Sequence, residues 1–409
     1  MSELLTSNGY QKAADAASAH ICIINSCTVT ATGDAKCRKV INRTRRENPS
    51  CIIVLCGCMP QAFADQPEVF RGCDIVMGNT ARRDIIAMLN EYLAERKQII
   101  RIDPHQKEEA FEPMQISGFD ERTRAFVKIE DGCNRFCSYC IIPYARGKVR
   151  SKPLDTLSSE AKALAGAGYK EIVLVGINLS AYGQELGLNI FDAVHTVCMI
   201  DGIERVRLGS IEPERMTRDL LSALAQEKKF CPQFHLSLQS GCDATLKRMR
   251  RHYDTAEYAR IVADIRELFD NPAITTDVMV GFVGESEEEF EQSLAFCDRI
   301  GFAKAHVFPY SVRKGTAAEK MDGHLDEGIK HRRAEVMIAH TAEKQREFMI
   351  GQIGRTASVL IEKASSDYCE GYSENYTKIR IPDTRRISGE TVEVLITEAF
   401  DDYCVGVVR

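Results

Sequence analysis

The feature that most constrains the fold is a long alternation of short apolar runs and helical patterns. Between residues 122 and 349, six runs of strand length are separated by stretches with helical periodicity. The runs are Phe126–Ile129, Ile172–Val175, Arg205–Leu208, Phe234–Leu238, Ile274–Val280 and Lys304–Phe308. Because strands joined by helical returns run parallel, this order predicts a partial (β/α)6 barrel. Chemistry in such barrels lies at the carboxyl ends of the strands.

A shorter alternation of the same kind occupies residues 1–105. Ile21–Asn25, Ile52–Leu55 and Asp74–Met77 are predicted strands, and Asp34–Arg46 is a predicted helix between the first two. Short links between these elements predict a parallel α/β domain. Residues 106–121 lack periodicity and carry Pro113 and Gly118, so we expect a linker there.

Residues 350–409 have a different pattern. Ala357–Glu362, Tyr376–Ile381 and Val392–Ile396 alternate apolar and polar residues over strand length. Short alternating strands without helices between them predict a small antiparallel β-barrel. The whole chain is therefore expected to be an α/β protein with a parallel domain over 1–105, a partial barrel over 122–349 and a β-barrel over 350–409.

Composition excludes several classes of protein. No run of about 18 apolar residues occurs, and the N-terminus has no apolar core flanked by basic residues. We therefore expect a cytoplasmic protein that makes no contact with a membrane. The sixteen cysteines are not a disulfide framework in such a reducing compartment. Those that stand in loops beside glycine, asparagine or another cysteine are candidate ligands.

Three cysteines stand close together in the segment GCNRFCSYC, directly after the first strand of the predicted barrel. Cys133, Cys137 and Cys140 have the spacing C-x3-C-x2-C. Thiolates are the preferred ligands of iron–sulfur clusters, and three of them can hold three irons of a 4Fe-4S cube. A structural zinc site normally has four protein ligands, and no histidine stands nearby. The triplet therefore predicts a cluster with one open iron.

This segment resembles the cysteine motif of the radical S-adenosylmethionine (SAM) superfamily. The resemblance implies that the amino and carboxylate groups of SAM bind the open iron, and that one electron cleaves SAM to a 5′-deoxyadenosyl radical. It also implies that Tyr139 packs near SAM. Strand-end positions that correspond to SAM contacts in that superfamily are Gly176, Glu212, Gln239 and Asp277.

Longer segments resemble the tRNA methylthiotransferases, in order, over nearly the whole chain. They include NSCTVTATGDAKCRKVINRTRRENP, VLCGCMPQ, LQSGCDATLKRMRR, TDVMVGFVGES and HVFPYSVRKGT. The resemblance implies two 4Fe-4S clusters, SAM, and a TRAM-like β-barrel that binds tRNA. It further implies that a methylthio group replaces the C2 hydrogen of a modified adenosine at position 37, beside the anticodon. One SAM methylates the sulfur and another supplies the radical. We expect a monomer reduced by a flavodoxin or ferredoxin, with a sulfur donor that the sequence does not identify.

Cys27 and Cys58 match two of the three ligands of the family's second cluster. Both follow predicted parallel strands, so both can reach one edge of the sheet. The third ligand of the family lies in a Gly-Cys-x-x-Asn turn, and this chain contains no such segment. Cys37 is not expected to replace it, because the predicted inward face of the helix consists of Cys37, Val40, Ile41 and Thr44.

The N-terminus itself resembles a stretch inside the family's first helix. A parallel α/β domain should open with a strand, and none precedes this stretch. We therefore expect a misassigned start, upstream of which a strand and the Gly-Cys turn are encoded. The alternative is a real variant whose second cluster is disabled.

Basic residues form three local patches, although the formal net charge is −6. One patch recurs at helical spacing, a second follows the cysteine triplet and a third lies farther along. Such patches favour contact with RNA phosphates, the alternative being ordinary solvated helix faces. They are Lys36, Lys39, Arg43 and Arg46; Arg146, Lys148 and Arg150; and Lys247, Arg248, Arg250 and Arg251.

Two segments indicate the branch of the family. GCNRFCSYCIIPYARG and GYSENYTKI resemble the branch that acts on N6-threonylcarbamoyladenosine. The alternatives are the branch that acts on N6-isopentenyladenosine and the related enzyme that methylthiolates an aspartate of a ribosomal protein. From a different class, the chain could be a non-catalytic, cluster-bearing RNA-binding protein. The intact triplet argues against that class, because a binding protein needs no open iron.

Overall fold

A computed structural model describes residues 1–28, 30–106, 109–112, 123–382 and 388–409. Most of the predicted linker 106–121 lies outside these residues. The described contacts divide the chain into two compact units. Unit 1 contains Met1–Glu112, Gly132–Val149 and Ser311–Lys320, and unit 2 contains Pro113–Asp131, Arg150–Tyr310 and Met321–Arg409. The predicted domain boundaries stay a prediction. Within the described part, no helix is long and apolar enough to cross a membrane.

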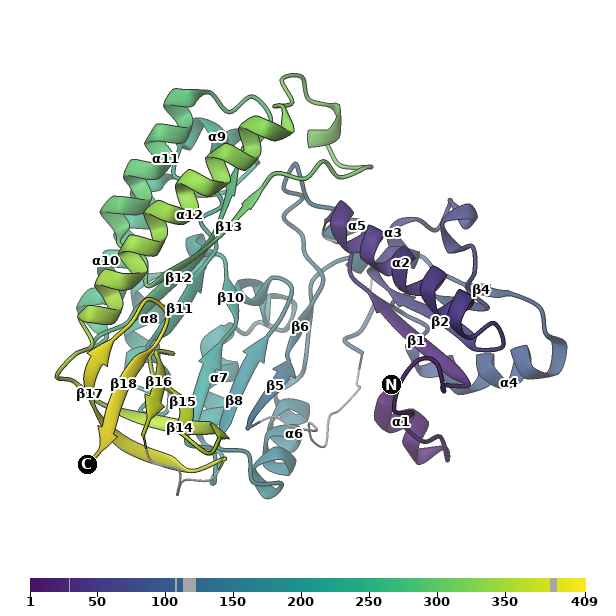
Figure 1. Ribbon diagram of the computed structural model, residues 1–409, viewed down its shortest axis with the longest axis horizontal. Helices are drawn as coiled ribbons and strands as arrows, with labels where there is room; N and C mark the ends of the chain where they lie inside the picture. Colours follow the sequence, from purple (N-terminus) through teal and green to yellow (C-terminus); the bar gives the residue numbers. More distant parts are fainter. Residues whose placement is uncertain (29, 107–108, 113–122, 383–387) are drawn as a thin grey trace. The chain divides into compact units, whose positions relative to one another are not determined.

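The sheet of unit 1 is parallel, with four strands in the order of the sequence (Figure 1). The strands are β1 (Ile21–Ser26), β2 (Ile52–Gly57), β3 (Ile75–Met77) and β4 (Ile99–Arg101). The helices are α1 (Ser2–Ser7), α2 (Ala31–Glu47), α3 (Cys58–Ala62), α4 (Ile85–Glu95) and α5 (Ile142–Arg146). The first three strands confirm the predicted parallel α/β fold. The sequence analysis did not predict β4, although it predicted β3, which is equally short.

Helix α2 begins where the side chain of Thr30 accepts a hydrogen bond from the Gly33 amide at 3.1 Å. Its buried face carries Cys37, Ile41 and Thr44, as predicted. The expected inward position of Val40 is wrong, since this side chain is 46% exposed. At 100° per residue, Val40 falls at the margin of the buried stripe.

Six parallel strands form the centre of unit 2 and confirm the predicted partial (β/α) barrel. They are β5 (Arg124–Lys128), β8 (Glu171–Val175), β9 (Arg205–Leu208), β11 (Gln233–Leu236), β12 (Ala273–Val280) and β13 (Lys304–Pro309). A two-residue strand, β10 (Ser210–Ile211), continues β9 after Gly209 and pairs with β11. The Cys231 amide also donates to the Val206 carbonyl at 2.9 Å, which joins the two halves of the sheet.

Helices connect these strands, and Figure 1 shows α10, α11 and α12 along β11–β13. The helices are α6 (Leu154–Gly166), α7 (Ile190–Cys198), α8 (Arg218–Ala225), α9 (Asp243–Arg248), α10 (Thr255–Leu268), α11 (Glu287–Ile300) and α12 (Glu327–Ile350). A short antiparallel pair, β6 (Glu130–Asp131) with β7 (Arg150–Ser151), stands where the chain leaves unit 2 and returns to it. The segment with the cysteine triplet lies between β6 and β7 in the sequence and belongs to unit 1.

The C-terminal residues form a closed five-stranded barrel, as predicted. Its strands are β14 (Thr356–Ala364), β15 (Cys369–Ser373), β16 (Lys378–Ile381), β17 (Thr391–Ala399) and β18 (Cys404–Val408), in the order β14-β15-β16-β18-β17. One detail differs from the purely antiparallel expectation, because β16 and β18 run parallel. The interior is filled by buried apolar side chains such as Val359, Ile379 and Val394.

A buried charge cluster, the arginine clamp, joins this barrel to the sheet of unit 2. Arg124, Arg205 and Arg207 surround the buried carboxylate of Glu171. Arg205 donates to the carbonyls of Tyr372 (3.0 Å) and Ser358 (2.6 Å), and Arg207 donates to that of Glu374 (2.9 Å). Burial alone would raise the pKa of Glu171, but Arg207, Arg124 and Arg205 hold it below its ordinary value.

Two tyrosines of the segment GYSENYTKI contact the arginines of the clamp. The rings of Tyr372 and Tyr376 stack with centroids 4.6 Å apart. The Arg124 guanidinium lies 5.0 Å from the first centroid and 4.9 Å from the second, and that of Arg207 lies 4.8 Å from the Tyr376 centroid. Both tyrosines therefore hold the barrel in place through cation–π contacts.

Candidate functional site

Cys27 and Cys58 directly follow two neighbouring strands at the carboxyl edge of the unit 1 sheet. The residues before them, Ser26 and Gly57, are register partners of the parallel strands β1 and β2. The Ser26 hydroxyl donates to the Cys56 carbonyl at 2.6 Å and accepts from the Met59 amide at 3.1 Å. These bonds fix the two strand ends to each other. Cys27 is exposed, whereas Cys58 is only 3% exposed.

Cys58 has a cationic neighbour that the sequence interpretation had assigned to RNA binding. The Nε of Arg146 donates to the Cys58 sulfur at 3.0 Å. Cys37, by contrast, lies in the apolar core of α2, β2 and α3. Burial, and then the nearby Asp34, raise the pKa of its thiol to about 11. The two cysteines thus lie in different environments, and the assignment of Cys58 as a ligand stays a prediction.

A buried ion pair that the sequence did not predict lies near Cys27. Arg313 binds Asp34 at 2.6 Å and also donates to the hydroxyl of Thr28, the residue that follows Cys27. The Thr28 hydroxyl in turn donates to Asp34 at 2.8 Å. All three residues are buried within unit 1. The only sequence signal for Arg313 was its place in the segment HVFPYSVRKGT, far from Cys27 in the chain.

The cysteine triplet occupies a loop of unit 1. Cys137 is 8% exposed, and Cys133 and Cys140 are partly exposed, as is Tyr139. The Cys133 amide donates to the Gly147 carbonyl at 3.0 Å, and the Cys140 amide donates to the Cys137 carbonyl at 3.0 Å. The first bond joins the start of the loop to Gly147, and the second closes the turn between Cys137 and Cys140.

The donor set of this loop fits an iron–sulfur cluster. Among the described residues, no three histidine, cysteine, aspartate or glutamate side chains are grouped tightly enough to hold one metal ion. Each cysteine of a 4Fe-4S cube binds a different iron, so its ligands need not converge on one point. Three thiols on one closed loop, without a histidine, have the chemistry of such a cluster and not of a mononuclear site.

In unit 2, Gly176 adjoins a buried carboxylate that the sequence analysis missed. Glu130 is fully buried, and its Oε2 accepts from the Asn178 amide at 2.6 Å. A Cβ on Gly176 would lie 2.6 Å from that same oxygen, so only glycine fits. Among the described atoms, Glu130 Oε1 and Asn178 Oδ1 have no hydrogen-bond partner. Burial raises the pKa of Glu130 to about 8, which favours a neutral carboxyl that can both donate and accept.

The structure brings Gln239 and Asp277 together. Gln239 has a left-handed backbone (φ +66°), its amide donates to the Asp277 carbonyl at 2.9 Å, and its Oε1 is buried without a partner in the described part of the chain. The Asp277 carboxylate lies 3.3 Å from His235 Nε2. Glu212 is bound instead by Arg251. Glu212 and Gln239 follow strands β10 and β11 as predicted, whereas the expected strand-end position of Asp277 is wrong, because this residue lies inside β12. The contact of these residues with SAM stays a prediction.

The predicted RNA contacts differ in their surroundings. Lys36, Lys39, Arg43 and Arg46 are all exposed on α2, although Arg43 and Arg46 also pair with Glu47 at 3.0 and 3.4 Å. Lys247 is exposed. Arg248 instead binds Glu289 (2.9 Å) and the Val283 carbonyl (3.1 Å). The α2 flank is therefore the better candidate for a phosphate contact.

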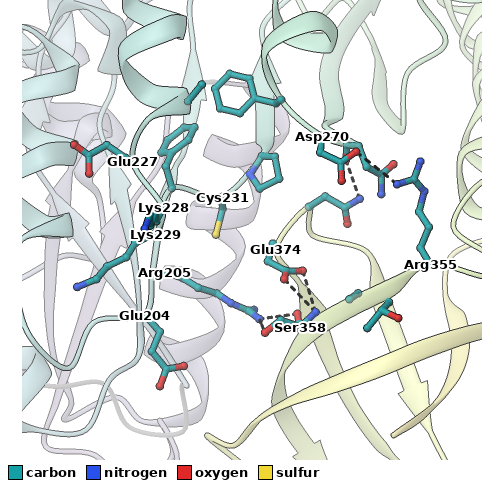
Figure 2. Close-up of a pocket in the computed structure, with 18 of the residues that line it drawn as sticks. Glu204, Arg205, Glu227, Lys228, Lys229, Cys231, Asp270, Arg355, Ser358 and Glu374 are labelled. Carbon is teal, nitrogen blue, oxygen red and sulfur yellow. Dashed lines mark hydrogen bonds and ion pairs between the residues drawn. The ribbon is translucent and has the colours of Figure 1, made fainter. Parts of the chain in front are cut away.

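A cavity of about 550 Å³ lies at the opposite edge of the unit 2 sheet (Figure 2). It is bordered by residues that precede β11 and β12 and by the C-terminal barrel. Two of its arginines already have protein partners, since Arg205 donates to Ser358 and Arg355 lies 3.8 Å from Asp270. The cavity is thus distinct from the carboxyl-edge positions predicted to bind SAM.

Comparison with known families agrees with this geometry. The radical SAM superfamily matches residues 127–297, and the family described as "Uncharacterized protein family UPF0004" matches residues 1–78. The radical SAM methyltransferase TsrM from Kitasatospora setae superposes with a TM-score of 0.54 at 14% identity. The match covers 75% of this chain and 64% of TsrM, and it shows the fold alone.

Curated relatives match along most of their length. The threonylcarbamoyladenosine tRNA methylthiotransferase MtaB of Bacillus subtilis is 35% identical over 95% of this chain and 88% of the relative. MtaB of Aquifex aeolicus is 37% identical over 89% of each chain. The tRNA-2-methylthio-N(6)-dimethylallyladenosine synthase of Pelotomaculum thermopropionicum is 34% identical over 88% of this chain and 82% of the relative. With this identity and coverage, the chain belongs to the radical SAM tRNA methylthiotransferase family.

Proposed function

We propose that this enzyme inserts a methylthio group at C2 of N6-threonylcarbamoyladenosine at position 37 of tRNA. The observation that carries the proposal is the match, over about nine-tenths of both chains, to relatives named for that substrate. The cysteine triplet, in a fold of the radical SAM type, agrees with it. We expect the reaction to take place in the cytoplasm.

Membership of the radical SAM superfamily implies a 4Fe-4S cluster and SAM. When bound at Cys133, Cys137 and Cys140, that cluster would supply the electron that cleaves SAM. In unit 2, the oxygens of Glu130, Asn178 and Gln239 that have no partner among the described residues are hydrogen-bonding groups available to a polar ligand. The role of this chain in that step is to orient SAM and to exclude water from it.

A second cluster at Cys27 and Cys58 would supply the site for the sulfur that is transferred. Cys27 and Cys58 at neighbouring strand ends would be two of its three protein ligands, and the Gly-Cys-x-x-Asn segment that carries the third in the family does not occur in this sequence. Arg146 places a positive charge beside Cys58. We propose that tRNA phosphates bind Lys36, Lys39, Arg43 and Arg46. The electron would come from a flavodoxin or ferredoxin.

The second candidate substrate is N6-isopentenyladenosine in tRNA. It is favoured by one observation, the 34% identity to a synthase named for the dimethylallyl nucleoside. The clamp tyrosines of GYSENYTKI do not separate the two substrates, because they bind Arg124 and Arg207 within this chain.

The experiment is mass spectrometry of tRNA nucleosides from a deletion strain, complemented with the wild-type gene or with Cys133→Ala. We expect the methylthio form of threonylcarbamoyladenosine to vanish in the deletion strain and its precursor to accumulate. Only the wild-type gene should restore it. Loss of the methylthio isopentenyl nucleoside instead would assign the enzyme to the second substrate.

A further inference from the structure

Helix α5 connects the two groups of cysteines. It begins two residues after Cys140, the last cysteine of the triplet, and it packs against α3, which begins with Cys58. All of these residues belong to unit 1. A five-residue helix therefore spans from one predicted cluster to the other.

The C-terminal end of α5 is held from three sides. Asn79 Nδ2 donates to the Ala145 carbonyl oxygen at 2.7 Å, and His105 Nε2 lies 3.1 Å from the same oxygen. Gly147 then turns the chain with φ +72°, where a Cβ would come within 3.0 Å of the His105 ring. Its carbonyl accepts from the Cys133 amide. The backbone of Arg146 is therefore fixed relative to the triplet loop.

From this position, Arg146 directs its Nε–H to the Cys58 sulfur at 3.0 Å. The sulfur belongs to a residue that is 3% exposed, and Arg146 is half-buried, so the contact is partly shielded from water. A neutral thiol is only a weak hydrogen-bond acceptor. A metal-bound thiolate carries negative charge and is a much better acceptor for a permanently charged donor.

We propose that Arg146 is a positioning residue of the second cluster. Its Nε–H donates to the sulfur through which Cys58 binds iron, and it raises the reduction potential of that cluster. Reduction adds negative charge, so a cationic donor on a ligating sulfur stabilises the reduced form. This inference rests on the proposed function, because it requires that Cys27 and Cys58, the two family ligands present in this sequence, hold the second cluster.

The test uses the Cys133→Ala/Cys137→Ala/Cys140→Ala parent, reconstituted without oxygen with iron and sulfide, in which only the second cluster remains. Its midpoint potential is measured by electron paramagnetic resonance during a redox titration, together with iron per chain. We expect Arg146→Gln to lower the potential and Arg146→Lys to lower it less. Arg83→Gln removes an exposed cation of the same unit and should leave the potential unchanged.

A second background separates a local effect from a folding defect. In Cys58→Ala, where only the triplet cluster is expected, Arg146→Gln should leave the spectrum of that cluster unchanged. A changed spectrum there, or equal second-cluster potentials in the Arg146→Gln variant and its parent, would overturn the role of Arg146. A parent that binds no iron would instead overturn the second cluster itself, and the inference with it.

Discussion

At the scale of single residues, close contacts explain why some predicted positions need their amino acid. Gly176 was predicted from its place after a strand, as a contact to SAM. The structure gives it a further reason, because a side chain there would strike Glu130. Glu130 stood next to the triplet in the sequence, but nothing in the pattern showed that it was buried. Burial depends on the returning strands β8 and β7, which sequence periodicity does not place.

Gly176→Ala tests this contact. We expect a loss of about 1–3 kcal/mol in stability, because the new methyl group would lie 2.6 Å from Glu130 Oε2. Gly166→Ala is the control, since a Cβ there has nothing within 4 Å. The measurement is the urea midpoint followed by circular dichroism. Equal midpoints for the two variants would show that the Gly176 site can accommodate a methyl group.

Glu130 should also make stability depend on pH. Its pKa of about 8 in the folded chain lies above its ordinary value near 4.5, so the folded state binds the proton more tightly. Its contribution is therefore fully present below about pH 4.5 and is lost as the pH rises to about 8, by at most roughly 1.4 kcal/mol per pH unit. Glu130→Gln should flatten this decline in urea midpoints between pH 5 and pH 8. An unchanged slope would mean that the carboxyl is already ionised at pH 5.

At the scale of elements, regular strands and helices were predictable and short elements were not. All six barrel strands and three strands of unit 1 appeared where the apolar runs predicted them. β4, β15 and β18 were missed. β15 and β18 each carry a glycine, a residue that strands disfavour, whereas β4 is no shorter than the predicted β3. The sequence also could not show that 311–320 joins unit 1, because that depends on a buried pair between residues far apart in the chain.

Arg313→Met tests that pair. It leaves the Asp34 carboxylate buried without its cation, and we expect a cost of about 3–5 kcal/mol. Hydrogen exchange read by mass spectrometry should show faster exchange in β1 and α2. Arg43→Met breaks the exposed pair with Glu47 and should cost under about 1 kcal/mol. Equal exchange in both variants would contradict a structural role for Arg313.

The exposed flank of α2 is the element expected to meet tRNA. Changing Lys36, Lys39, Arg43 and Arg46 together to Gln should weaken binding and lower the slope of log affinity against log salt by about three. The control changes three exposed cations elsewhere in unit 1, namely Arg71, Arg83 and Lys97. The same slope in both variants would make the flank ordinary surface charge.

At the scale of the whole molecule, the C-terminal barrel belongs to the same compact unit as the (β/α) sheet. The arginine clamp accounts for this, since three arginines of the sheet reach carbonyls and rings of the barrel. The segment GYSENYTKI, which indicated the branch of the family, serves this attachment. The resemblance indicated only that this segment is typical of the family, whereas the structure shows that its tyrosines contact Arg124 and Arg207.

Arg207→Met should loosen that attachment. Glu171 would lose its closest cation, and we expect faster hydrogen exchange in β14–β18 and earlier proteolysis between α12 and β14. Arg218→Met breaks the pairs that this residue of α8 makes with Asp264 and Glu267 of α10, outside the barrel, and is the control. Equal protection of the barrel in both variants would show that its own core, and not the clamp, fixes it.

The central claim is best tested by one competition reaction. The reconstituted enzyme, SAM and a reductant are mixed with equal amounts of two tRNAs, one bearing N6-threonylcarbamoyladenosine and the other N6-isopentenyladenosine. Mass spectrometry of the digested tRNA then identifies the methylthio products, with Cys133→Ala as the control. We predict the methylthio form of threonylcarbamoyladenosine together with 5′-deoxyadenosine, and neither product from the variant. Methylthiolation of the isopentenyl nucleoside alone, or of neither tRNA by an enzyme that cleaves SAM, would contradict the account.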